Sequence, residues 1–272
     1  MKAKASALLR PLSRAGFWLK TGASLAVLAL TMVALDLAFP PPMEAARSGS
    51  LIVTDARGIP LRAFPTEDGR WRLRANLENT DPLFIEALIG VEDERFYSHW
   101  GVDVLAVVRA SGQALTNGRI VSGASTITMQ TARLLEPRPR NLGSKLIEMF
   151  RAFQLERRLS KDEILELYLT LTPYGGNLEG LRSASWAYFG REPDRLSDDQ
   201  IALLLALPQS PEVRRPDLRL ENARAARARL LERMTELELI SVARADEAAE
   251  LPLPGRHAFP ALGWHASVLN AA

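Results

Sequence analysis

The first hydrophobic pattern along the chain is an almost unbroken apolar run over residues 21–39, TGASLAVLALTMVALDLAF. Its length approaches the ~20 residues that a helix needs to cross a bilayer. Basic residues precede the run and few follow it closely, which favours an N-terminus in the cytoplasm. We expect a cytoplasmic basic tail over residues 1–20 and a single-pass transmembrane anchor over residues 21–39. A cleaved signal peptide is the alternative, although no clear A-x-A site ends the run.

Alternating polar and apolar residues follow this run. Two short alternating segments, LIVT and IPLRAF, lie on either side of a turn that contains Gly58, which predicts a β-hairpin. A third segment, WRLRANL at residues 71–77, suits another strand of a small, half-exposed sheet. We therefore expect residues 40–78 to form a linker and a small β segment.

From Asp81 onward the pattern becomes helical. The Asp81-Pro82 pair is typical of a helix start, because proline is tolerated at the first helical position. A second helix is expected over residues 102–115. Two capping-box signatures predict further helix starts, Ser160 with Glu163 and Ser197 with Gln200.

The later apolar segments indicate buried helices. The run IALLLAL at residues 201–207 is too short to span a membrane, so we expect it in the core. Residues 221–250 are rich in Ala, Arg, Glu and Leu and predict one or two solvated helices. We expect a mainly α domain over residues 79–217 and a helical C-terminal extension over residues 218–272.

Composition narrows the class of protein. The chain has 272 residues, of which 47% are hydrophobic and 24% charged, and this suits a globular domain with one good core. It has no cysteine, which excludes disulfides, zinc-thiolate sites and cysteine nucleophiles. Basic residues outnumber acidic ones only because of the first twenty positions, which contain no acid. The pI near 9.1 therefore reflects the N-terminal tail and does not indicate nucleic-acid binding.

The segment richest in candidate chemistry is EDERFYSHWG at residues 92–101, where three acids follow an apolar run. An acidic triplet alone would be explained by a solvated helix end. Three further blocks that follow it in order weaken that explanation: GASTITMQ (123–130), SKLIE (144–148) and KDEILELYL (161–169).

These four blocks, in this order, resemble the peptidoglycan glycosyltransferase domain of class A penicillin-binding proteins, glycosyltransferase family 51. Two later segments, TPYGGNLEGLRSASWAYFG and LPQSPEVRRPD, extend the resemblance over roughly residues 50–217. The resemblance implies a lysozyme-like, mainly α fold with a small β hairpin stalk. It also implies an inverting enzyme that polymerises lipid II into glycan strands and releases undecaprenyl pyrophosphate.

The same resemblance implies where the protein acts and what it contacts. The catalytic domain would lie on the outer, periplasmic side of the cytoplasmic membrane. Its partners would be lipid II, the growing glycan strand, the membrane and proteins of cell-wall synthesis, with no nucleic acid. The chemistry requires a carboxylate base, donors for the phosphates of the leaving group and an apolar rim for the lipid.

By resemblance, Glu92 matches the catalytic acid that accepts the proton of the acceptor sugar's 4-hydroxyl, and Asp93 matches a structural neighbour. His99 on its own is more often a packed or surface histidine, and the resemblance gives it no catalytic role. We therefore predict Glu92 as the general base.

The second block offers candidate substrate-binding residues. Ser125 and Thr126 supply hydroxyls, and Gln130 supplies an amide. Arg133 lies three residues after Gln130, so one helical face can present both. If a helix begins at this block, its free N–H groups favour a phosphate, and Gly123 would let the backbone approach it. A β-branched core segment is the alternative.

The third block contains Lys145 and Glu148, which are adjacent on a helix at i, i+3 spacing. Spacing alone favours an exposed salt bridge of little value. The resemblance instead assigns Lys145 to the pyrophosphate and makes Glu148 a second catalytic carboxylate, acting directly or through a divalent cation such as Mg²⁺. We assign no metal ligands and no certain cofactor. Ser144 stands where the family pattern has arginine, and Thr170 where many members have asparagine.

Two other functions remain open at this point: a lysozyme-type glycan-cleaving enzyme, which also uses carboxylates, and a non-catalytic docking module of a cell-wall synthesis complex. The chain contains no S-x-x-K motif, and the residues after 217 are too few for a penicillin-binding transpeptidase domain. We expect either a single-activity protein or a truncated fragment of a bifunctional one.

Overall fold

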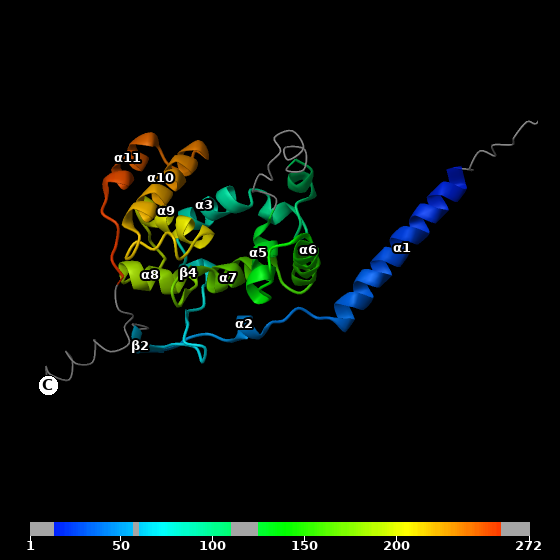
Figure 1. Cartoon of the computed structure of the whole chain (residues 1–272), viewed down its shortest axis with the longest axis horizontal. Coiled ribbons are helices and arrows are strands. Elements are labelled where there is room, and N and C mark those ends of the chain that lie inside the picture. The colour runs from blue at the N-terminus through cyan, green and yellow to red at the C-terminus, as the bar shows by residue number, and fades with distance from the viewer. Residues whose placement is uncertain (1–13, 57–59, 110–124, 257–272) are drawn as a thin grey trace, which may run out of the picture. The chain divides into compact units, whose positions relative to one another are not determined.

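A computed structural model describes residues 14–56, 60–109 and 125–256 (Figure 1). The chain divides into two compact units, Met1–Pro41 and Pro42–Ala272. The expected turn at Gly58, the glycine at position 123, most of the basic tail and the last residues of the chain lie outside the described ranges.

The first unit contains helix α1 (Arg14–Ala38), which covers nearly all of the expected anchor. Several of its apolar side chains are largely exposed, including Val27 at 62%, Leu30 at 70% and Leu37 at 76%. Within the described residues, however, no helix combines the length and the apolar character that a membrane crossing requires.

The second unit begins with the short helix α2 (Glu44–Arg47) and the expected hairpin. Strands β1 (Leu51–Thr54) and β2 (Pro60–Phe64) pair antiparallel, with Leu51 opposite Phe64, which confirms the hairpin. The third strand was wrongly expected in the same sheet. Strand β3 (Trp71–Arg72) instead pairs in parallel with β5 (Leu178–Glu179), which pairs antiparallel with β4 (Pro173–Gly175).

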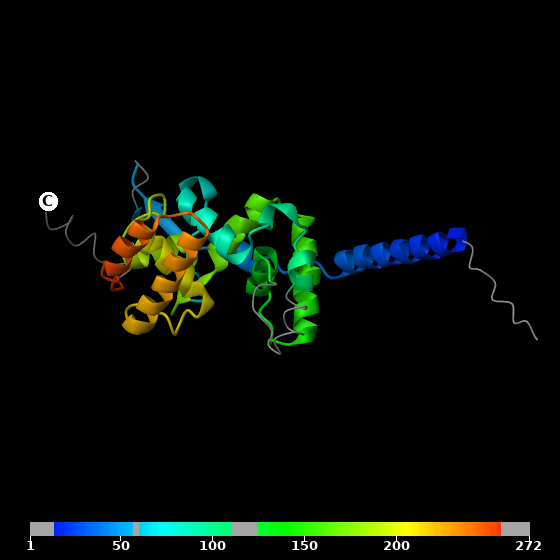
Figure 2. The same cartoon turned by 90° about the horizontal axis from the view of Figure 1, so that it is seen from above.

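The rest of what the structure describes in the second unit is mainly helical, as the pattern predicted (Figures 1 and 2). Its α-helices are α3 (Pro82–Glu92), α5 (Ile127–Leu135), α6 (Leu142–Glu156), α7 (Lys161–Leu171), α8 (Leu181–Phe189), α9 (Asp198–Ala206), α10 (Leu220–Glu236) and α11 (Val242–Glu250). Short 3₁₀ turns in the described ranges are η1 (Leu77–Asn79), η2 (Phe96–Ser98) and η3 (Leu207–Gln209).

The helix starts follow the local sequence signals. Asp81 caps α3 by accepting the Leu83 N–H at 2.9 Å. The capping boxes at Ser160 and Ser197 are both present, at the starts of α7 and α9. The helix expected over residues 102–115 begins only at 104 and is seen to 109, since residues 102 and 103 are not helical; residues 110–115 lie outside the described ranges.

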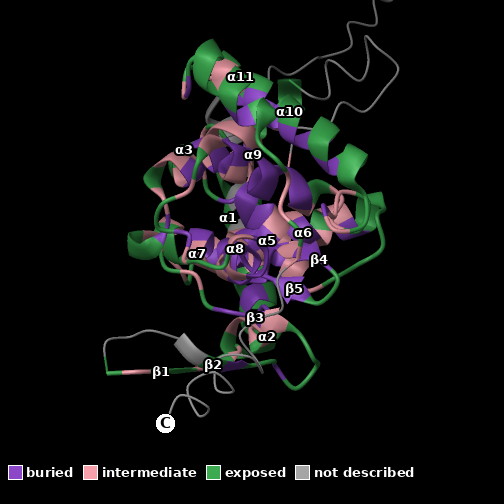
Figure 3. Cartoon of the chain, turned by 90° about the vertical axis from the view of Figure 1, so that its left-hand side faces the viewer, coloured by how far each residue is buried: buried purple, intermediate pink, exposed green. Residues whose placement is uncertain are grey.

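Helix α9 forms the centre of the core, as expected for the apolar run it contains. Its residues 201–206 are at most 4% exposed, and it packs against α3, α8, α10 and α11. Helices α5, α6 and α7 form a second packed group that joins the first through α8. Figure 3 shows buried residues gathered along α9, α8 and α5, with exposed residues on the outer faces of α10 and α11. This framework supports the end of α3 and the start of α5.

Candidate active site

Glu92 is the last residue of α3 and lines a cavity of about 200 Å³. Ser125, which stands just before α5, lines the same cavity. Two amides hold the Glu92 carboxylate: Gln130 Nε2 donates to Oε2 at 3.0 Å, and Gln209 Nε2 donates to Oε1 at 3.3 Å. The carboxylate is thus oriented from two sides while it remains partly exposed.

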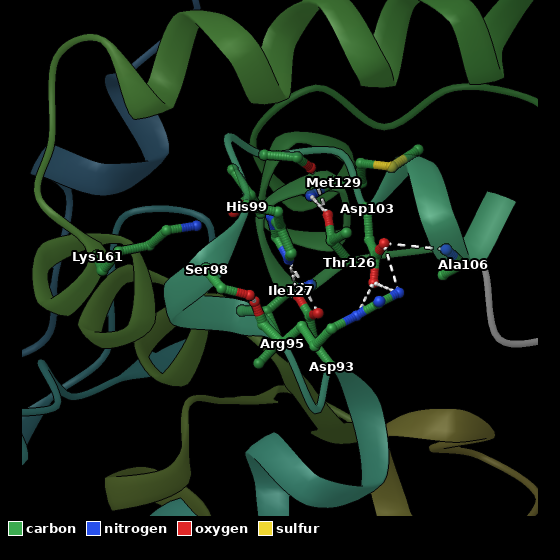
Figure 4. A network of polar contacts seen from close by, with 12 residues as sticks. Asp93, Arg95, Ser98, His99, Asp103, Ala106, Thr126, Ile127, Met129 and Lys161 are labelled. Carbon is green, nitrogen blue, oxygen red and sulfur yellow. Dashed lines mark hydrogen bonds and ion pairs between the residues drawn. The ribbon is translucent and has the colours of Figure 1, made fainter.

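Asp93 has different surroundings from Glu92, because it is buried and joins three segments (Figure 4). His99 Nε2 lies 2.9 and 3.0 Å from its two carboxylate oxygens. The Ile127 N–H, at the start of α5, donates to Oδ2 at 2.9 Å. Asp93 also lines the Glu92 cavity, but its carboxylate and His99 tie the motif to α5, which suits structural roles.

Thr126 is the N-cap of α5, and its side chain is engaged on both sides. Its Oγ1 donates to the Gly101 carbonyl at 2.6 Å and accepts the Met129 N–H at 3.1 Å. The residue is only 2% exposed. Asp93 and Thr126 itself accept from two of the N–H groups at this helix start, Ile127 and Met129. Thr126 also lines the Glu92 cavity, and its binding of a phosphate stays a prediction.

Ser125 belongs to a separate polar group with Lys145 and Glu148. Lys145 Nζ donates to Ser125 Oγ at 2.6 Å and to Glu148 Oε2 at 3.1 Å. Glu148 is buried, at 9% exposure, so the pair is not the fully exposed surface salt bridge that spacing alone favoured. The segment 125–130 is therefore linked to both carboxylates. Gln130 donates to Glu92, and Ser125 is connected to Glu148 through Lys145, which donates to both.

Arg133 lies on the same helix as Gln130 but lines a different cavity, of about 350 Å³. Other arginines surround this second cavity, and two of them, Arg70 and Arg72, are paired with Glu179. The structure thus does not bring Arg133 into the cavity that Glu92 and Ser125 line.

Comparison with known proteins identifies the family. The sequence matches the family described as Transglycosylase over residues 57–235, a range that contains every block discussed above. The chain belongs to the transglycosylase family.

Individual transglycosylase relatives agree with this assignment. Penicillin-binding protein 1C of Escherichia coli is 43% identical over 244 residues, which are 90% of this chain and 32% of that protein. Penicillin-binding protein 1A of E. coli is 35% identical over 201 residues, 73% of this chain and 24% of that protein. A protein named as a transglycosylase from Cupriavidus necator is 40% identical over 168 residues, 61% of this chain and 72% of that protein.

The chain spans a third or less of the length of the two penicillin-binding proteins it matches. Among solved structures, penicillin-binding protein 1A from Haemophilus influenzae aligns with a TM-score of 0.42 and 16% sequence identity. That alignment covers 82% of this chain and 24% of the other.

In this transglycosylase, the Glu148 carboxylate is paired with a lysine. The described residues contain no group of three or more His, Asp or Glu side chains that could hold a metal ion. The ammonium group of Lys145 also already lies 3.1 Å from Glu148 Oε2. A cation at this carboxylate would have to compete with the lysine.

The two departures from the family pattern are both buried. Ser144 is 8% exposed, and its N–H donates to Asn141 Oδ1 at the start of α6. Thr170 is 5% exposed, and its hydroxyl accepts the Ala75 N–H at 3.0 Å and donates to the Glu166 carbonyl. Thr170 therefore fastens the segment after β3 to α7 rather than facing the cavity.

Sequence reasoning missed several residues of the Glu92 cavity. Gln209 contacts Glu92 from outside the cavity lining, and its position between two prolines just after a buried helix was a usable signal. Three arginines also line the cavity, from three different segments: Arg95, Arg109 and Arg233. Arg95 is engaged by Asp103 at 2.7 Å, and Arg109 is exposed.

Proposed function

We propose that this transglycosylase is a peptidoglycan glycosyltransferase that polymerises lipid II into glycan strands with inversion and releases undecaprenyl pyrophosphate. The observation that carries the proposal is the position of Glu92, a partly exposed carboxylate held by Gln130 and Gln209 at a cavity shared with Ser125. A base must lie within hydrogen-bond reach of the proton it removes, and this cavity leaves Glu92 accessible to a bound hydroxyl.

The proposed reaction uses the two carboxylates at opposite ends of the transfer. The 4-hydroxyl oxygen of the acceptor sugar attacks the anomeric carbon of the donor, and its proton passes to Glu92. The bond between the anomeric carbon and the pyrophosphate breaks on the opposite face, which inverts the configuration. The leaving group takes the bonding electrons and gains negative charge.

Lys145 and Ser125 are proposed to bind that developing charge. Lys145 already points at Ser125 Oγ, so a phosphate oxygen can take the place of either contact. Glu148 holds the ammonium group in position from the other side. Preorganised donors at the site where charge develops are among the largest contributions to catalysis. Arg133, in its separate cavity, is proposed to contact a more distant part of the donor.

The proposal also places the protein at a membrane surface. Lipid II and the growing strand carry lipid tails, and the first unit offers exposed apolar side chains on α1 for contact with a bilayer. We propose that this segment holds the catalytic unit at the periplasmic face of the cytoplasmic membrane. Confinement of both substrates and enzyme to one surface raises their effective concentration.

The test is polymerisation of labelled lipid II by the Glu92→Gln variant, with glycan strands separated on a gel. The amide keeps the size of the side chain but cannot accept the proton, so we expect polymerisation to fall at least a hundredfold, on the order of what general bases contribute. Glu78→Gln, an exposed glutamate on η1, is the matched control and should polymerise like the wild type. Strands of normal length and rate from Glu92→Gln would refute the assignment.

A further inference from the structure

The segment after α9 contains a glutamine and an arginine that reach toward Glu92. Gln209, the last residue of η3, donates from Nε2 to Glu92 Oε1. Arg214 Nη1 donates to the side-chain carbonyl of Gln209, Oε1, at 2.8 Å. The same Arg214 nitrogen also donates to the Ala206 carbonyl at 2.7 Å. The arginine is half-buried, and the glutamine is exposed beside the cavity.

The direction of this chain of hydrogen bonds is set by chemistry. An arginine only donates, so the atom of Gln209 that faces Arg214 must be its carbonyl oxygen. The amide nitrogen of Gln209 is then turned toward Glu92, where it can only donate to the carboxylate. Arg214 is itself fixed to the end of α9 through Ala206, which belongs to the core.

Arg214 also differs from the neighbouring arginine. Arg215 forms an ion pair with Asp217 at 2.7 Å, an ordinary reason for an arginine at this place. The two hydrogen bonds described for Arg214 go instead to uncharged acceptors, Ala206 and Gln209. These hydrogen bonds of Arg214 therefore orient the Gln209 side chain and form no ion pair.

We propose that Gln209 and Arg214 are positioning residues for the carboxylate of Glu92, with Arg214 acting through Gln209. Gln130 holds one carboxylate oxygen from α5, and Gln209 holds the other from the end of α9. The carboxylate plane is then fixed from two separate elements of the core. The 3.3 Å contact is long for a hydrogen bond, as expected for a catalytic contact that shortens when substrate is bound. The inference rests on the proposed role of Glu92.

The test measures kcat and KM for lipid II in four variants: Gln209→Ala, Arg214→Ala, the double variant and Arg214→Lys. We expect kcat to fall about tenfold in Gln209→Ala with KM nearly unchanged, because the glutamine contacts the base and not the substrate. Arg214→Ala should lower kcat less. The double variant should be no worse than Gln209→Ala, since the arginine acts only through the glutamine.

Arg214→Lys keeps a donor and should restore most of the kcat lost in Arg214→Ala. Arg224→Ala, which removes an exposed arginine paired with Glu221 on α10, is the control for loss of a surface charge and should be unchanged. Thermal unfolding of each variant shows whether the chain is folded, and kcat is counted per folded protein.

Three outcomes would overturn the inference. Wild-type kcat in Gln209→Ala would show that Glu92 needs no such partner. A raised KM with normal kcat would mean that Gln209 binds substrate directly. Additive losses in the double variant would separate Arg214 from Gln209. These results are distinguishable from failure of the proposed function, which would appear as normal activity of Glu92→Gln.

Discussion

At the scale of single residues, the EDERFYSHWG motif combines a partly exposed carboxylate, held by two amides, with buried neighbours that form the wall around it. Glu92 faces the cavity, whereas Asp93 and Phe96 are buried. The resemblance of this motif to the family predicted Glu92 as the general base, and that role stays a prediction. Gln209 could not be predicted in the same way, because its contact with Glu92 joins positions 117 residues apart and depends on how α3 and α9 pack.

Gly101, the last residue of the motif, allows a sharp test of that wall. Its φ is +76°, and a Cβ at this position would lie 3.0 Å from the backbone carbonyl of Ala152 on α6. We expect Gly101→Ala to lower the free energy of unfolding by roughly 3 kcal/mol, from backbone strain and overpacking together. Urea unfolding measures the loss.

The matched control for this prediction is Gly190→Ala. Gly190 has a similar φ of +68°, but a Cβ there would have nothing within 4 Å. Its replacement should cost about 1 kcal/mol, from the left-handed conformation alone. Equal losses in the two variants would show that contact with α6 does not constrain the motif.

At the scale of elements, α5 connects the two polar groups of the site. Its N-cap region carries Ser125 toward Lys145, and its second turn carries Gln130 toward Glu92. The sequence left open whether a helix or a β-branched core segment begins here, and the structure shows the helix, with Gln130 and Arg133 both on it. Sequence reasoning did not foresee that Asp93 occupies the helix start, because that contact depends on the tertiary approach of the α3 end to α5.

Thr126 is expected to matter for folding and not for substrate binding. Thr126→Ala removes the cap of α5 and the bond to Gly101, so we expect a loss of roughly 1–2 kcal/mol in the free energy of unfolding. Thr126→Ser keeps the hydroxyl and should retain both stability and polymerisation. If Thr126→Ser is stable but has a strongly raised KM for lipid II, Thr126 binds the substrate after all.

At the scale of the whole second unit, segments far apart in sequence pack together around a helical core. The residues that follow η3 pack on the turn after β4, where a Cβ on Gly175 would lie 2.6 Å from Arg215 Cγ. Arg215 in turn holds Asp217 through two hydrogen bonds, at 3.1 and 2.7 Å. The helical pattern predicted the layers of this unit, but not the parallel pairing of β3 with β5, because two-residue strands carry no usable periodicity.

The Asp217–Arg215 pair predicts how the stability of this unit depends on pH. The hydrogen bond from Arg215 holds the pKa of Asp217 below its ordinary value. A carboxylate whose pKa is lowered by folding contributes stability that is complete above the unfolded pKa of about 3.9 and is lost as the pH falls through the folded pKa. Asp217→Asn should therefore reduce the free energy of unfolding at about pH 6 but make progressively less difference below about pH 4.

Asp246→Asn, at an exposed position on α11, is the control and should leave the pH dependence of the free energy of unfolding unchanged. Urea unfolding between about pH 6 and the lowest accessible pH measures the difference in free energy of unfolding between Asp217→Asn and the wild type. If that difference stays constant down to the lowest pH, the pair stabilises the unit by packing alone and its charge contributes nothing.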